Sequence, residues 1–120
     1  MQVDVRQRGS IEVIDIRGEA EPRNGEGILR ERLAPLMDAG ECLFILNITR
    51  GPVLDSGFLG ELVACRERVR KRHGVIKLVL TRGQRDLIVA SRLDALFETF
   101  QDEDDALDSF LAENTTAGIP

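Results

Sequence analysis

Two short apolar runs, with a long helical pattern between them, limit what this chain can fold into. The runs cover residues 42–48 and 75–81, and aliphatic side chains fill most of their positions. Continuous apolar runs of this length are typical of strands that are covered on both faces. The helical pattern from Asp55 to His73 is long enough to carry the chain from one strand to a parallel neighbour. The sequence therefore predicts an α/β fold with parallel crossovers.

The rest of the chain extends this arrangement on both sides. Residues 2–8 alternate apolar and polar, residues 11–18 are rich in β-branched side chains, and the turn-forming Arg8-Gly9-Ser10 lies between them. This pattern predicts a β-hairpin. The later segments predict helices over residues 28–40, 84–96 and 102–113 and a short edge strand over residues 98–100. Pro35 lies inside the first of these helices and should kink or destabilise it.

Length and charge restrict the function classes. With 120 residues, no internal repeat and no linker, we expect one domain over residues 1–113, followed by a flexible tail over residues 114–120. A net charge of −5 argues against nucleic-acid binding, because such a chain gains nothing from counterion release. No apolar run is long enough to span a membrane, and the first residues lack a secretory pattern. We therefore expect a cytoplasmic protein with two reduced cysteines.

Enzymatic chemistry has little support in the sequence. The single histidine, His73, falls at a predicted helix end beside several basic residues, where a cation suits the helix dipole. No Walker or dinucleotide motif, metal-ligand spacing or nucleophile triad is present. We expect no catalytic residue, no metal and no cofactor. The receiver fold, another α/β switch, is rejected because Asp15 lacks acidic neighbours in place and Lys77 lies inside a strand.

The most informative segment is the passage from the strand at residues 42–48 to the helix that begins near Asp55. Asp55 or Ser56 is well suited as the N-cap, because its side-chain oxygen can accept a free amide of the first turn. A serine there is also exposed, and phosphorylation would add about two negative charges beside the positive end of the helix. Residue chemistry alone favours the simpler interpretation, in which the pair only caps the helix.

Several motifs in order resemble the STAS domain of bacterial anti-sigma factor antagonists. Members carry a strand with Asp or Asn near its end, then Asp-Ser-Ser/Thr/Ala-Gly-Leu-Gly at a helix start, and later a Leu-x-x-hydrophobic-Phe segment. The matching residues here are Asn47, Asp55-Ser56, Leu59-Gly60 and Leu93–Phe97, while residues 16–21 resemble an early Gly-Glu-Leu-Asp loop. The resemblance covers residues 3–112. It implies a mixed sheet of four to five strands with about four helices packed on it.

The central motif departs from the family at the position that usually accepts phosphate. Aligned on Leu59 and Gly60, that position holds Gly57, and the usual glycine position holds Phe58. Three interpretations follow. The switch is lost and the protein binds constitutively, or Ser56 has become the acceptor, or a one-residue shift in the loop brings Ser56 into the acceptor place.

The resemblance implies a regulatory binding protein. Family members bind an anti-sigma factor that is a GHKL-type serine kinase and so release a sigma factor, and a PP2C-type phosphatase reverses their phosphorylation. Carried over, the phosphorylation candidate is Ser56, and the protein is expected to be a monomer or weak dimer. Phe58 is either an exposed apolar anchor or a core residue. The partner-binding residues would be Gly18, Glu19, Glu21, Leu54, Asp55, Ser56, Gly57 and Phe58.

Two other functions stay open at this point. A scaffold or sensor subunit of a larger signalling assembly would elute as a large oligomer. An enzyme of small α/β type would show turnover that disappears in a Ser56→Ala variant.

Overall fold

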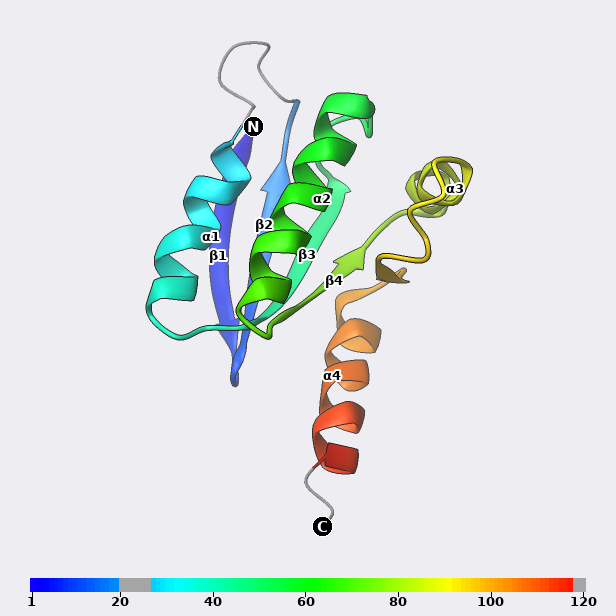
Figure 1. Cartoon of the computed structure of the whole chain (residues 1–120). Helices are drawn as coiled ribbons and strands as arrows, with labels where there is room; N and C mark the ends of the chain where they lie inside the picture. Colours follow the sequence, from blue (N-terminus) through cyan, green and yellow to red (C-terminus); the bar gives the residue numbers. More distant parts are fainter. Residues whose placement is uncertain (20–26, 118–120) are drawn as a thin grey trace.

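A computed structural model gives the structure of residues 1–19 and 27–117, with side chains described through Glu113. The strands are β1 (Gln2–Arg8), β2 (Ile11–Arg17), β3 (Leu43–Arg50), β4 (Val75–Val79) and β5 (Glu98–Phe100). The helices are α1 (Ile28–Asp38), α2 (Ser56–Lys71), α3 (Arg82–Ala90) and α4 (Glu103–Ala117). Figure 1 shows helices on the two faces of one twisted sheet.

The five strands form one sheet in the order β1-β2-β3-β4-β5. The hairpin pair β1 and β2 is antiparallel, and every other neighbouring pair is parallel. β3 is therefore the central strand, as its apolar run predicts, and β5 is the predicted short edge strand. The mixed α/β sheet expected from the sequence is confirmed.

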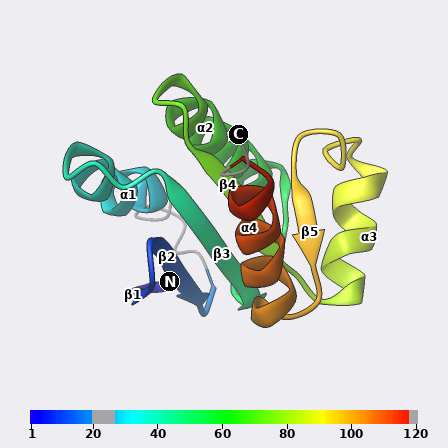
Figure 2. The same ribbon diagram turned by 90° about the horizontal axis from the view of Figure 1, so that it is seen from below.

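Alternating residues of the strands build two cores. One face of the sheet packs on α1, α2 and α3, and its fully buried residues include Ile14, Leu46, Leu62 and Leu78. The other face packs on α4, where Ala106 and Phe110 meet Val13, Ile45 and Val79. Figure 2 shows α4 on the opposite side of the sheet from α1 and α2. Because α4 is a single helix, it covers only part of its face.

The helix boundaries differ from the sequence prediction at α3 and α4. α3 ends at Ala90, not at Leu96, because Arg92 adopts a positive φ of 59° and the Leu93 amide turns back to the Ile88 carbonyl. Leu87 inside α3 is exposed, although the pattern placed it on the apolar face. α4 continues to Ala117, four residues past the predicted end.

A buried lysine joins α4 to the sheet. Lys77 on β4 has no exposed side-chain surface, and its ammonium donates to Ser109 Oγ at 2.6 Å and to Glu113 Oε1 at 2.8 Å. The same ammonium lies 4.3 Å from the centre of the Phe110 ring. These partners compensate the loss of hydration that burial of a charge costs. Lys77, a cation inside an otherwise apolar strand, thus forms a tertiary contact with α4.

Candidate functional site

The carboxyl ends of β2 and β3 lie side by side, and the end of β3 leads into the loop before α2. The Gly18 amide, just past β2, donates to the Arg50 carbonyl at the end of β3 at 2.9 Å. Gly18 has a φ of 80°, a region in which glycine is favoured. This contact places Gly18 beside the end of β3, at the carboxyl ends of the strands, where functional groups of open α/β sheets usually gather.

Asp55 is the N-cap of α2. Its Oδ1 accepts the Phe58 amide at 2.9 Å, and its carbonyl accepts the Leu59 amide at 2.9 Å. Ser56 is therefore the first residue of the helix, and its side chain is exposed. The cap fixes the Ser56 hydroxyl at the positive end of a helix of 16 residues.

Two predicted contact residues are buried. Leu54 and Phe58 are each only 5% exposed and belong to the core between α2 and the sheet. Phe58 lies on the same helical face as Leu62, Cys65 and Val69, which explains why it points inward. Of the two interpretations of Phe58, the core residue is correct, and neither side chain lies on a surface that a partner could reach.

Val53 is an exposed apolar residue that the sequence interpretation missed. Its side chain is 71% exposed, between the buried Pro52 and the buried Leu54. A signal was present, because in an extended segment the neighbours of a buried residue point the opposite way. Val53 therefore replaces Phe58 as the apolar anchor candidate at this edge.

The surface of α2 next to Ser56 is made of very small residues. Gly57 and Gly60 are both exposed. A Cβ added at Gly60 would meet no atom within 4 Å, and one at Gly57 would meet only Asp55 Oδ1 at 3.5 Å. Packing inside the described chain therefore does not require glycine at either position.

Two further predicted residues belong to the early loop. Glu19 is exposed and follows Gly18 at the end of β2. Glu21 lies outside the described residues, so its prediction stays untested. Val53, Asp55, Ser56, Gly57 and Gly60, with Gly18 and Glu19, are called the α2 start surface below.

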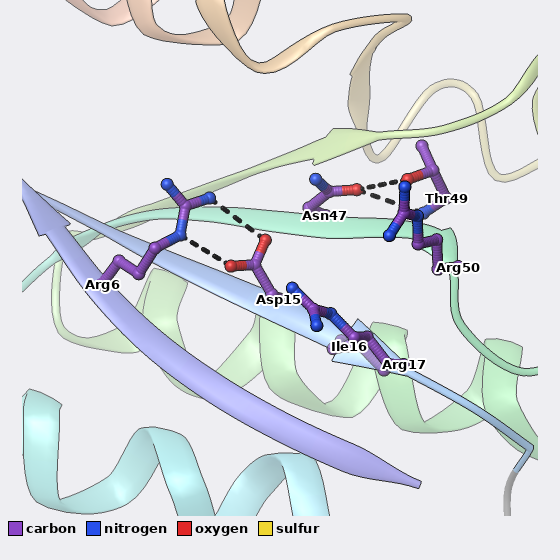
Figure 3. A pocket seen from close by; sticks show the side chains of 7 residues that line it. All are labelled: Arg6, Asp15, Ile16, Arg17, Asn47, Thr49 and Arg50. Atoms are coloured by element: carbon purple, nitrogen blue, oxygen red, sulfur yellow. Dashed lines mark hydrogen bonds and ion pairs between the residues drawn. The ribbon is translucent and has the colours of Figure 1, made fainter.

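A hollow of about 380 Å³ lies at the carboxyl ends of β2 and β3, on the face of the sheet opposite to α2. Figure 3 shows the residues that line it: Arg6, Asp15, Ile16, Arg17, Asn47, Thr49 and Arg50. Asp15 accepts two hydrogen bonds from the Arg6 guanidinium, at 2.7 and 3.1 Å. Asn47, which occupies the Asp/Asn position of the STAS pattern, accepts from the Thr49 amide and from Thr49 Oγ1. Asn47 therefore has a local role in holding the end of β3.

A cluster of charges fastens the hairpin to the start of α4. Glu103 accepts hydrogen bonds from both Arg6 and Arg8. These donors, Arg6 first, hold the pKa of Glu103 below its usual value, although partial burial acts in the other direction. Hydrogen bonds to Asp15 first, and then to Glu103, raise the pKa of Arg6. Arg6 is thus a fixed, paired cation at one side of the hollow.

The described residues carry no cluster suited to a metal ion and no helix suited to a membrane. Residues 1–19 and 27–117 contain no group of three or more His, Cys, Asp or Glu residues arranged to hold a metal ion. None of the described helices is both long and apolar enough to cross a membrane.

Comparison with solved structures identifies the fold. A crystal structure of an anti-sigma factor antagonist from Mycobacterium paratuberculosis superposes with a TM-score of 0.76 and 21% identity, over 90% of this chain and 92% of that one. The chain has the STAS fold. The NMR structure of the protein TM1081 matches equally well, with a TM-score of 0.76 and 14% identity over 90% of this chain and 87% of that one. No family model matches this STAS-fold chain, and no curated protein sequence does.

Proposed function

We propose that this chain is an anti-sigma factor antagonist that binds a GHKL-type serine-kinase anti-sigma factor and so releases a sigma factor. The observation that carries the proposal is the α2 start surface, where an exposed serine begins a capped helix beside an exposed valine. The fold is that of an anti-sigma factor antagonist over nearly the whole chain. In this proposal the protein acts by binding, in the cytoplasm, where sigma factors act.

The α2 start surface has the features of a protein-docking site. Val53 provides an apolar group that burial against a partner would stabilise, at about 25 cal/mol for each Å² removed from water. Glycine inside a helix costs roughly 0.5–1 kcal/mol relative to alanine. Because internal packing does not require Gly57 or Gly60, we attribute them to close approach of the partner's backbone.

Ser56 is the acceptor in this proposal. Its hydroxyl is exposed at the helix start, whereas Gly57, in the usual acceptor position, has no group to modify. A phosphoserine at this place would be tolerated by the free helix, since negative charge complements the helix N-terminus. In the complex the same dianion would be removed from water, which is costly unless the partner pairs it. Phosphorylation would therefore release the partner without unfolding the antagonist, and a PP2C-type phosphatase would restore binding.

Intact-protein mass spectrometry tests the switch. The protein is incubated with ATP and a GHKL-type anti-sigma factor kinase from the same organism, with Ser56→Ala as the matched variant. We expect one phosphate adduct in the natural sequence and none in Ser56→Ala. An unchanged mass in both samples, with binding to the kinase still measurable, would mean that the protein is a constitutive competitor and that the switch is lost.

A further inference from the structure

Two arginines are neighbours in the register at the ends of adjacent parallel strands. Arg17 on β2 and Arg50 on β3 are partners in the strand register, and both are exposed. Two exposed cations on neighbouring strand ends repel each other, although solvent screens the repulsion. Neither guanidinium forms an ion pair with any carboxylate of residues 1–19 or 27–113. The chain keeps this unfavourable pair although its own net charge is −5.

The hollow beside these arginines offers mainly hydrogen-bond donors. Arg17 and Arg50 extend over it from one side and Arg6 from the other (Figure 3). Asp15 is neutralised by Arg6, with which it forms an ion pair at 2.7 Å. Because the oxygen of Asn47 accepts from Thr49, the Asn47 amide group is left as a donor. Three guanidinium groups and one carboxylate give the lining an excess of two positive charges.

The size and lining of the hollow restrict the ligand. A volume of about 380 Å³ lies at the small end of the range for ligand sites. Ile16 is the one apolar residue among those that line it, and it is 1% exposed, so the hollow offers no apolar wall to a ligand. Guanidinium groups bind phosphate with paired hydrogen bonds. A compact, highly charged ligand fits these conditions.

We propose that the hollow between Arg6, Arg17 and Arg50 binds the phosphate groups of a small phosphorylated molecule. Arg17 and Arg50 would each donate to the phosphate oxygens, and the Asn47 amide would add a third donor. The bound anion would remove the repulsion between the two arginines, so the protein with ligand would be more stable than the protein alone. The hollow lies on the α4 face of the sheet and Ser56 at the start of α2 on the other face, so the phosphate would bind away from Ser56, although Gly18 of the α2 start surface adjoins Arg17 and donates to the Arg50 carbonyl.

Isothermal titration calorimetry of the full chain with pyrophosphate, at constant ionic strength, tests the proposal. We expect saturable binding at one site, weakened at least tenfold in Arg17→Gln and in Arg50→Gln. Arg92→Gln is the matched control, because Arg92 is exposed at the end of α3 and does not line the hollow. Its affinity should equal that of the natural sequence. The absence of saturable binding, or an equal loss in all three variants, would overturn the proposal.

Two further measurements separate the alternatives. Thermal unfolding without ligand should show that Arg17→Gln and Arg50→Gln melt no lower than the natural sequence, since each removes one of two neighbouring cations and breaks no ion pair. A melting temperature far below that value would show that the arginines are structural and would overturn the proposal. A phosphoserine peptide serves as a second probe. Binding of the peptide more tightly than pyrophosphate would assign the hollow to a phosphorylated protein and refute a small-molecule site.

Discussion

Replacing Gly60 with alanine should raise the free energy of unfolding by about 1 kcal/mol, the difference between glycine and alanine inside a helix. The added Cβ meets no atom within 4 Å, so no steric cost opposes this gain. For a chain of 120 residues, 1 kcal/mol corresponds to a rise in melting temperature of roughly 3–6 °C. The same methyl group would project from the α2 start surface, so Gly60→Ala should bind the anti-sigma factor more weakly than the natural sequence.

Far-UV circular dichroism in a denaturant titration is the suitable assay, because the chain has no tryptophan or tyrosine to report unfolding by fluorescence. Gly74→Ala is the contrasting variant. A Cβ at Gly74 would lie 2.5 Å from the Cys42 carbonyl oxygen and 2.6 Å from Val69 Cγ1, so it should destabilise by about 1–3 kcal/mol. Unfolding of Gly60→Ala at a lower denaturant concentration than the natural sequence would refute the reasoning, because Gly60 would then serve the fold and not the partner.

Three further predictions concern buried and charged groups. Burial raises the pKa of Cys65 to about 12, so a thiol reagent at pH 8 should modify only Cys42 in the folded protein and both cysteines after denaturation; fast reaction of two thiols would contradict this packing. Lys77→Met should change the free energy of unfolding by less than about 1 kcal/mol, because the carboxylates of Glu98 and Glu113 that it leaves behind are about half exposed and stay hydrated. A much larger loss in a denaturant titration would show that the ammonium itself stabilises the fold. Glu103 has a lowered pKa, so the stability that it contributes is present above its ordinary pKa of 4.5 and is lost as the pH falls below it. Glu103→Gln should therefore reduce the loss of stability at acid pH in a stability–pH profile. An unchanged loss at acid pH would exclude Glu103 as its source.

The order of elements could be predicted because each one has a local signature. The continuous apolar run of β3 and the glycine turn of the hairpin are examples, and the structure contains both. The burial of Phe58 was also open to prediction, because its spacing to Leu62, Cys65 and Val69 is that of one helical face.

Features that depend on tertiary contacts could not be predicted. The partners of Lys77 lie 32 and 36 residues further along the chain, on α4. No local sequence pattern predicts that α4 packs over β4. The pairing of Arg17 with Arg50 depends on the register of two strands that are joined by a long crossover. The early end of α3 depends on a positive φ at Arg92, a residue type that gives no signal of a stop.

Binding of a GHKL-type anti-sigma factor from the same organism, measured by calorimetry, tests the central claim most directly. Val53→Ser is compared with Val89→Ser. Val89 is 44% exposed, lies near the end of α3 and is not part of the α2 start surface. Burying a valine contributes about 1.5 kcal/mol or more, which is about tenfold in affinity. We predict that Val53→Ser binds at least tenfold more weakly and that Val89→Ser binds like the natural sequence. Equal affinities for all three proteins, or no binding by the natural sequence, would contradict the account.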